Sequence, residues 1–255
     1  GYGADVDATL LLRSIDDARR GGDEPALLPL RCGAPVAVGR DRVAAARTLR
    51  AAHPEVDVIV SDDGLQHLRL ARDAQVIVFD ERGVGNGCLL PAGPLRERLP
   101  SRTPARSLIV YNASAPSTPL PGVVGTRRLR GVVELPAWRR RDAGPAHAAA
   151  GFDALQGRPV VAAAGIARPQ RYFAMLREAG LRIVQTIALP DHHAYATLPW
   201  PAGTADVVVS EKDAIKLEPE RLGGTRVWVT PLDFEIDDDA FDAALLALLP
   251  APRAR

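Results

Sequence analysis

The stretch PVVAAAGIARPQRYFAMLREAGLRIVQTIAL, at residues 159–189, predicts a strand, a helix and a second strand in succession. The two ends of the stretch, 159–165 and 181–189, are predicted to be strands. The helix is expected over 168–179, with Pro169 in its first turn, where proline is tolerated, and Gly180 at its end. Such a unit indicates an α/β fold with parallel strands.

The same alternation extends over the rest of the chain. Before the opening stretch, apolar runs and helical spacing predict further elements: a helix over 24–32, a strand over 35–38, a helix over 41–53, and strands over 56–60 and 75–79. After it we expect strands over 206–210 and 226–230 and a closing helix over 238–249. Strands that alternate with helices favour a doubly wound sheet.

Two segments suggest how the chain is divided. Residues 112–126 are rich in Pro, Ser, Gly and Ala, which predicts a linker. Residues 127–141 carry six Arg against one Glu, and we expect them to form two short strands or a hairpin. The predicted domains are therefore a core over 1–126, a two-stranded linker over 127–150 and a second α/β lobe over 151–255.

Composition excludes several classes of protein. The 255 residues are 47% hydrophobic and 25% charged, which is close to the average of globular proteins and excludes a disordered chain. Basic and acidic residues number 32 and 31, so no overall charge favours a nucleic acid partner. Two cysteines exclude a disulfide framework. Only Lys212 and Lys216 are lysines and neither follows a glycine, so the sequence contains no P-loop.

The motif SDDGLQH, at 61–67, directly follows the predicted strand 56–60. Carboxylates at the carboxyl end of a parallel strand lie where α/β folds bind ligands. A hydrophobic strand that ends in Asp is also the Walker B arrangement, in which the carboxylate holds Mg²⁺. Asp62 and Asp63 are therefore candidate magnesium ligands. The alternative is a turn in which an Asp caps the next helix.

Two further motifs carry acid–base side chains. In GGDEP, at 21–25, Asp23 precedes a helix and is either a catalytic carboxylate or a helix cap. In PDHHAY, at 190–195, Asp191 lies beside His192 and His193 after a strand. An Asp next to a His suits a base and its orienting partner, or a metal site. The alternative is a polar loop with one hydrogen-bonded histidine.

Two more motifs suggest ligand contacts. VGNGCLLPAGPLRE, at 84–97, imitates a dinucleotide loop, but its prolines exclude the helix that such a loop requires. Its Arg96 could instead clamp an anionic substrate, because a guanidinium binds phosphate through a planar fork; the alternative is an ordered surface loop. In SEKDAIK, at 210–216, Lys212 and Asp213 either touch a nucleotide or belong to a solvated helix start.

The order of these motifs resembles that of the tetraacyldisaccharide 4'-kinase family, from Gly1 to about Leu232. The resemblance implies transfer of the γ-phosphate of ATP to the 4'-hydroxyl of a tetraacylated glucosamine disaccharide 1-phosphate, with Mg²⁺, in lipid A synthesis. It implies a P-loop-kinase-like parallel sheet with helices on both faces, and a smaller C-terminal α/β lobe joined by a two-stranded linker. It also implies peripheral contact with the cytoplasmic face of the bacterial inner membrane.

The resemblance also assigns roles to residues. Asp23 is expected to be the general base and His192 its orienting partner, while Asp62 and Asp63 serve Mg²⁺ and Asp63 also belongs to the catalytic set. The remaining motif residues are expected to bind substrate (Gln66, His67, Asn86, Arg96 and Glu97) or to lie on the nucleotide side (Lys212 and Asp213). The basic segment around Trp138 either touches anionic headgroups or is a solvated hairpin.

One departure from the family concerns the phosphate-binding loop. In the family a Gly-rich loop lies upstream of a SRGYG-like stretch, whereas this sequence opens at GYG. We therefore expect that this loop has been lost from the sequence, and that the chain alone has almost no kinase activity. Two alternatives remain: a metal-dependent phosphoesterase built on the DHH and DD motifs, and a non-catalytic module that binds lipid or nucleotide.

Overall fold

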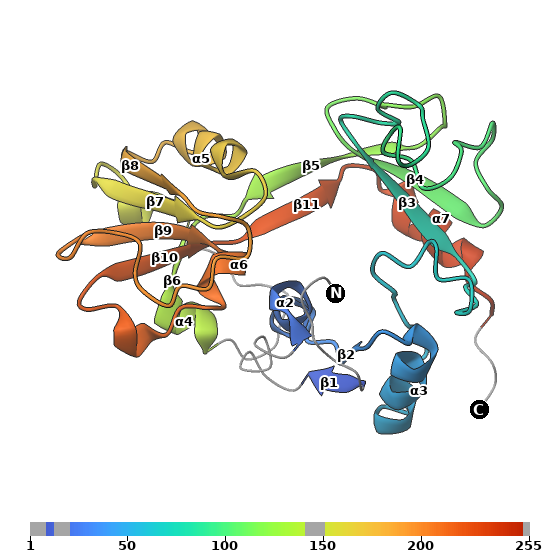
Figure 1. The fold of residues 1–255 in the computed structure, drawn as a ribbon, viewed down its shortest axis with the longest axis horizontal. Helices are drawn as coiled ribbons and strands as arrows, with labels where there is room; N and C mark the ends of the chain where they lie inside the picture. The colour runs from blue at the N-terminus through green and yellow to red at the C-terminus, as the bar shows by residue number, and fades with distance from the viewer. Residues whose placement is uncertain (1–8, 13–20, 141–150, 252–255) are drawn as a thin grey trace. The chain divides into compact units, whose positions relative to one another are not determined.

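The computed structural model describes residues 9–12, 21–140 and 151–251 (Figure 1). The chain divides into two compact units, each made of separate segments. The first unit comprises Gly1–Val56 and Leu129–Leu232, and the second comprises Asp57–Arg128 and Asp233–Arg255. No helix within the described ranges is long and apolar enough to cross a membrane.

The first unit is built on a five-stranded sheet with the order β6-β10-β9-β7-β8. Its strands are β6 (Val133–Glu134), β7 (Val160–Ala164), β8 (Ile183–Ala188), β9 (Asp206–Ser210) and β10 (Arg226–Thr230). All neighbouring pairs are parallel except β6 and β10, which are antiparallel. The strands predicted over 159–165, 181–189, 206–210 and 226–230 are confirmed.

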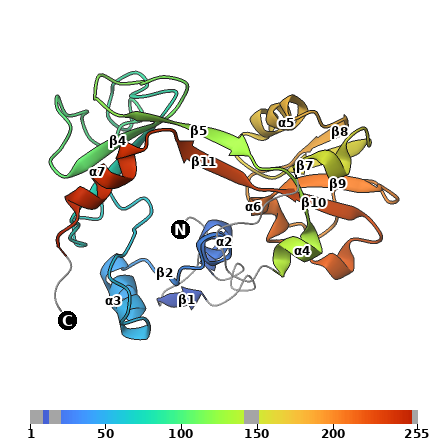
Figure 2. The same cartoon turned by 180° about the vertical axis from the view of Figure 1, so that it is seen from behind.

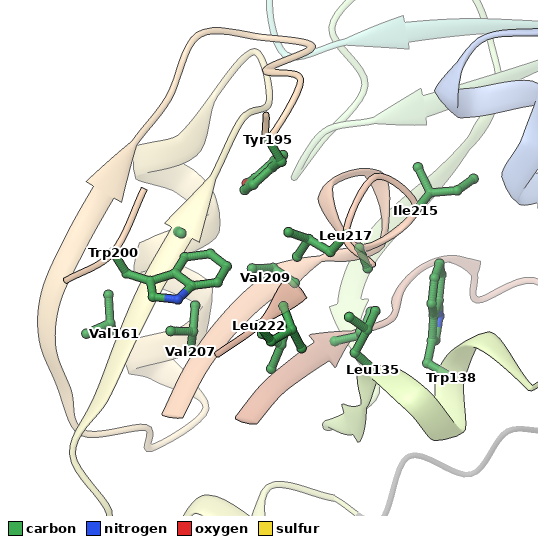
Figure 3. Close-up of a cluster of buried hydrophobic side chains, with 14 of the residues drawn as sticks. Leu135, Trp138, Val161, Tyr195, Trp200, Val207, Val209, Ile215, Leu217 and Leu222 are labelled. Carbon is green, nitrogen blue, oxygen red and sulfur yellow. The ribbon is translucent and has the colours of Figure 1, made fainter. Parts of the chain in front are cut away.

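Helices cover both faces of this sheet, because alternate residues of each strand point to opposite sides. On one face, helix α5 (Pro169–Glu178) packs Phe173 and Leu176 against Ala162 and Val208. On the other face, Val161 and Val209 pack in a cluster with residues of three helices (Figure 3), and Figure 2 shows the ribbons of these helices from behind. These helices are α2 (Asp23–Cys32), α4 (Leu135–Arg139) and α6 (Glu211–Ala214).

The end of α5 follows the sequence prediction. Pro169 is the first residue of the helix, and Gly180 has φ 86 directly after the last helical turn. The Leu181 N–H donates to the Leu176 carbonyl, which closes the helix in the pattern of a glycine-terminated end. The reversal brings the chain back parallel to β7, so β8 can pair with it.

A small antiparallel sheet also belongs to the first unit. It pairs β1 (Leu10–Leu12) with β2 (Val36–Val38). Helix α3 (Arg42–Ala52) follows, and the Asp41 carboxylate caps it by accepting the N–H groups of Val43 and Ala44. The strand predicted over 35–38 and the helix predicted over 41–53 are both confirmed.

The second unit contains a four-stranded sheet with the order β11-β5-β4-β3. Its strands are β3 (Gln75–Asp80), β4 (Ser107–Asn112), β5 (Val123–Leu129) and β11 (Leu232–Ile236), and the chain ends in helix α7 (Ala240–Leu248). β4 is parallel to both β3 and β5. Ile109, Tyr111 and Leu120 form its buried core, with the Tyr111 hydroxyl donating to the Leu120 carbonyl.

The strand predicted over 56–60 is wrong. These residues form no strand, and the side chains of Val58 and Val60 are 54% and 90% exposed. A β-branched run becomes a buried strand only when another strand supplies hydrogen bonds and a second layer covers it. Within the described residues no strand pairs with 56–60, so Asp62 and Asp63 follow an irregular, largely exposed segment rather than a buried strand.

The linker region also differs from the prediction. Residues 112–126 are not a linker throughout, because β5 begins at Val123, inside the segment. Two short strands occur near 127–141, as β5 and β6, but they belong to different sheets and so do not form a hairpin. Residues 141–150 of the predicted linker lie outside the described residues. The division into domains at 126 and 150 stays a prediction.

A buried carboxylate joins the carboxyl ends of β7 and β9. Asp213, in α6, is fully buried; it accepts the Gly165 N–H at 2.9 Å and the Ser210 hydroxyl at 2.6 Å. Burial raises the pKa of Asp213, and the hydrogen bonds from Ser210 and Gly165 partly oppose that effect. Gly165 directly follows β7 and Ser210 ends β9, so one side chain fixes both turns.

Asp213→Leu is expected to lower the free energy of unfolding by about 1–3 kcal/mol, because the buried Gly165 N–H would lose its acceptor. Asp213→Asn is the matched control: it retains an oxygen for this N–H and should lose less than the Leu variant. Urea denaturation followed by circular dichroism would measure both. A Leu variant as stable as the Asn variant would contradict the structural role of the carboxylate.

Candidate active site

An ionisable pair lies at the start of α2 in the first unit. Asp23 is the first residue of this helix, and its Oδ2 lies 3.1 Å from Nδ1 of His192, in the loop after β8. The Asp23 side chain is 16% exposed, while that of His192 is 44% exposed. The two residues are far apart in sequence, and packing of α2 against the sheet unit brings them together. The contact predicted between Asp23 and His192 is present.

Asp23 is not a helix cap, which was the alternative interpretation of GGDEP. The N-cap position is occupied by Gly22, at φ 93, and no side chain caps the helix. Asp23 comes one residue later, with its carboxylate directed to the His192 loop. The carboxylate is therefore not used to satisfy the N–H groups of its own helix.

The His192 backbone adopts a left-handed conformation, with φ 60. A residue other than glycine reaches this region rarely, and only when its surroundings hold it there. Here the His192 N–H donates to the Gly165 carbonyl at 3.2 Å and to the Asp191 carboxylate at 3.0 Å. Asp213 fixes the Gly165 turn, and that turn holds the backbone of His192. Contacts that begin at the sheet therefore position the His192 imidazole.

His193 has a different environment from His192. Its ring packs edge-on against Tyr195, with the ring centroids 5.0 Å apart, and its carbonyl accepts the Lys216 ammonium at 3.0 Å. The Tyr195 ring is buried and packs near Trp200. The two adjacent histidines are thus divided between an acid–base pair and an aromatic cluster.

Both lysines of the chain lie at this site. Lys216 Nζ is 3.0 Å from Asp23 Oδ2. Lys212 Nζ is 3.1 Å from Glu24 Oε1 and 3.2 Å from Asp191 Oδ1. Burial lowers the pKa of Lys212, but the hydrogen bonds and charges of Glu24 and Asp191 outweigh it and leave that pKa raised.

Asp191 shows the reciprocal effect: burial raises its pKa, while the hydrogen bond and charge of Lys212 more than compensate, so its pKa is lowered. The ion pairs with Asp191 and Glu24 therefore hold the Lys212 ammonium among carboxylates of the protein itself.

Asp213 is fully buried and leaves no surface for a ligand, so the predicted contact between Asp213 and a nucleotide is not supported. Its carboxylate instead holds the Gly165 and Ser210 turns.

The second unit brings two other sequence motifs together. The Arg96 guanidinium donates to Gln66 Oε1 at 3.0 Å and lies 3.9 Å from Asp63 Oδ2. Gln66 Nε2 in turn donates to Glu97 Oε1 at 3.3 Å. These residues come from SDDGLQH and VGNGCLLPAGPLRE, and all four side chains are exposed. Asp63 has φ 46, so it shares the left-handed backbone of His192.

The loop 84–97 is held in shape by Asn86. Its Nδ2 donates to the Ala92 carbonyl at 2.8 Å, and its Oδ1 accepts the Cys88 N–H at 3.1 Å. Gly93 packs so tightly here that a Cβ would clash with Asn86 Oδ1 and the Cys88 carbonyl. Asn86 thus shapes the loop, which borders an open pocket of about 510 Å³ lined in part by Leu89 and Leu95.

The carboxylates predicted to serve magnesium are exposed rather than buried, because the segment before them is not in the sheet. Among the described residues no group of three or more His, Cys, Asp or Glu side chains is arranged to hold a metal. Mg²⁺, however, is commonly bound through one or two carboxylates together with substrate phosphates and water. Asp62 and Asp63, adjacent on one turn, fit that mode. His67, from the same motif, is half-buried.

Trp138 cannot touch lipid headgroups in this structure. Its side chain is fully buried and its Nε1 donates to Glu211 Oε1 at 3.1 Å. The neighbouring Arg139 donates to the carbonyls of Ile215 and Leu217. The basic segment is therefore partly structural, because α4 packs into the core of the first unit.

Sequence analysis missed Lys216 and Gly93. For Lys216 a signal existed in the composition: lysine occurs only twice among 32 basic residues, and both lysines lie in SEKDAIK. Lysine carries a compact ammonium, whereas arginine carries a planar fork, so the two are not interchangeable at a site. Gly93 belongs to the PAGPLRE motif, but only the folded loop reveals its contact with Asn86.

Comparison with known proteins matches this chain to one family. The LpxK profile, described as tetraacyldisaccharide-1-P 4'-kinase, matches residues 1–250. Proteins named tetraacyldisaccharide 4'-kinase are similar to the chain: that of Methylibium petroleiphilum is 59% identical over 238 residues, covering 91% of this chain and 65% of that protein. That of Leptothrix cholodnii is 56% identical over 243 residues, with 91% and 66% covered. The chain spans just under two thirds of the length of these two relatives.

A third relative, from Herminiimonas arsenicoxydans, is 45% identical over 248 residues, covering 93% of this chain and 68% of that protein. A solved structure has a similar fold: "apo" form LpxK from Aquifex aeolicus in complex with ATP, with a TM-score of 0.73 and 21% identity, covering 96% of this chain and 75% of that one. The fold match confirms the predicted α/β class. The chain therefore belongs to the tetraacyldisaccharide-1-P 4'-kinase family.

Proposed function

We propose that this chain carries the acid–base and substrate-binding residues of a kinase. The kinase transfers the γ-phosphate of ATP to the 4'-hydroxyl of a tetraacylated glucosamine disaccharide 1-phosphate. The observation that carries the proposal is the Asp23–His192 pair, in a chain of the tetraacyldisaccharide-1-P 4'-kinase family. The use of ATP is supported by the related structure from Aquifex aeolicus, which was solved in complex with ATP.

Asp23 is proposed to accept the proton of the sugar hydroxyl. Phosphoryl transfer passes through a loose transition state, so catalysis consists mainly of positioning and charge stabilisation. A positioned general base contributes about 10²–10⁴-fold to the rate. His192 contacts Asp23 through Nδ1, and its strained backbone is held by Gly165 and Asp191. These contacts support the role of an orienting partner for His192.

Asp62 and Asp63 are proposed to hold Mg²⁺, and Asp63 to belong to the catalytic set. When bound, Mg²⁺ would neutralise charge on the transferring phosphates. The support is their donor chemistry: two adjacent carboxylates on one turn suit a metal that is otherwise bound by phosphates and water. The left-handed φ of Asp63 also supports a functional role, because such strain concentrates at ligand sites.

Gln66, His67, Asn86, Arg96 and Glu97 are proposed to form the substrate side. The hydrogen bonds that link Arg96, Gln66 and Glu97 orient donors and acceptors from two motifs on one surface. A guanidinium held in this way suits the planar recognition of a phosphate or of neighbouring hydroxyls. Asn86 acts indirectly, because its side chain is used to shape the loop that presents Arg96.

We place the protein at the cytoplasmic face of the bacterial inner membrane, in peripheral contact with the membrane that holds its lipid substrate. The chemistry of that substrate supports this placement, because its acyl chains lie in a bilayer. Lys212 stays a proposed residue of the nucleotide side, in an environment rich in carboxylates.

The kinase reaction is tested by incubating the complete gene product with ATP, Mg²⁺ and the tetraacylated disaccharide 1-phosphate. Asp23→Asn should lower kcat by about 10²–10⁴-fold, because the amide cannot accept the proton. KM for both substrates should change little. The unmodified protein should yield a disaccharide phosphorylated at the 4' position, and mass spectrometry would detect this product.

Asp153→Asn is the matched control for this variant. Asp153 is also an acidic residue at the start of a short helix in the first unit, and it is exposed. Its replacement should leave kcat unchanged. If Asp23→Asn instead raised KM and left kcat intact, Asp23 would be a binding residue rather than the base.

Arg96→Lys should raise KM for the lipid disaccharide by about 10- to 100-fold, which corresponds to the loss of one hydrogen bond to a charged group. Lysine retains the charge but cannot reproduce the planar fork. KM for ATP should not change. Arg102→Lys, at an exposed position on a nearby loop of the same unit, is the control. If Arg96→Lys raised KM for ATP as much as KM for the lipid disaccharide, a specific role of Arg96 in binding the lipid substrate would be excluded.

A further inference from the structure

We infer that Lys216 is a positioning residue for Asp23. Its ammonium and the His192 imidazole together hold one oxygen of the Asp23 carboxylate and so leave the other oxygen to face the substrate. The inference rests on the proposed function, because it names how the proposed base is oriented.

The geometry places an ammonium and an imidazole nitrogen next to a single oxygen. Lys216 Nζ lies 3.0 Å from Asp23 Oδ2, and His192 Nδ1 lies 3.1 Å from the same atom. None of the hydrogen bonds found among the described residues ends on Asp23 Oδ1. Two partners on one oxygen fix the plane of a carboxylate more firmly than one, because rotation about its last bond would break both contacts.

The Lys216 ammonium is held on more than one side. It donates to the His193 carbonyl at 3.0 Å and lies 5.9 Å from the centre of the Tyr195 ring. The Lys216 side chain is only 11% exposed, so it is less mobile than a surface lysine. Its neighbours Ile215 and Leu217 are buried in the core of the first unit, which anchors the backbone on both sides.

The two lysines at the site pair with different carboxylates. Lys212 pairs with Glu24 and Asp191, whereas the ammonium that contacts Asp23 is that of Lys216, beside the His192 imidazole. Lys216 is therefore the cation assigned to Asp23, while Lys212 serves the carboxylates beside it. Removal of Lys216 would leave the half-buried Asp23 carboxylate with the imidazole alone.

An arginine at this position would act differently. A guanidinium forks and binds both oxygens of a carboxylate, including the oxygen that must accept the proton. A compact ammonium contacts one oxygen only. Lysine is rare in this chain, two among 32 basic residues, and its presence beside Asp23 agrees with a need for the smaller group.

The test is a double-mutant cycle on the complete gene product, with ATP, Mg²⁺ and the tetraacylated disaccharide 1-phosphate. Lys216→Met should lower kcat by about 10- to 100-fold, a loss typical of removing a residue that orients a functional group, and KM should stay within about threefold. In the Asp23→Asn background, Lys216→Met should change kcat by less than about threefold, because residues that act as a unit are not additive.

Two further variants serve as controls for the cycle. Lys216→Arg retains the charge and should fold normally, yet its kcat should remain well below that of the unmodified protein. Arg177→Met removes an exposed cation from α5 of the same unit and should leave kcat unchanged. Near-UV circular dichroism checks the fold, and if Lys216→Met does not fold, the Lys216→Arg result decides.

Three outcomes would overturn the inference. The first is additive losses in the cycle, which would mean that Lys216 acts independently of Asp23. The second is a raised KM with unchanged kcat. The third is full recovery of kcat by Lys216→Arg, which would show that charge alone suffices. A failure of the unmodified protein to phosphorylate the disaccharide would instead refute the proposed function, so the two failures are distinguishable.

Discussion

The position of the acid–base pair in the first unit depends on one hydrogen bond between a buried carboxylate and a turn, that of Asp213 with the Gly165 N–H. The same turn offers its carbonyl to the His192 N–H, and His192 contacts Asp23. A side chain in the core thus fixes a strained loop, and the loop fixes an acid–base pair near the surface. Because the α6 segment also leads to Lys216, it supports the Asp23 carboxylate from two directions.

Much of the first unit could be predicted from sequence because its strands are continuous apolar runs and its helices have clear ends. Residues 160–164 and 206–209 are buried on both faces of the sheet, as such apolar runs predict. The run 56–60 has the same composition but no neighbouring strand among the described residues, so composition alone misled. LDFEI alternates apolar and acidic residues, which is the pattern of a half-buried strand. β11 was nevertheless missed, because it follows β10 after the single residue Pro231.

The candidate site shows the same limit. The contact between Asp23 and His192 was predicted from the order of motifs, whereas their spacing along the chain says nothing about it. Only the backbone conformation showed that Asp23 is not a helix cap, because Gly22 occupies the N-cap position. Lys216 could not be assigned to this site from sequence, because only the fold shows that its ammonium, rather than that of Lys212, contacts Asp23.

The first unit is assembled from segments that are distant in sequence, and this affects how the protein is made. Ala26, on α2, is buried in the same cluster as Leu135, Val207 and Val229. A ribosome releases the N-terminus first, at about 5–20 residues per second. The apolar face of α2 therefore stays without its native neighbours until β10 has been synthesised, and it is exposed to solvent for that time.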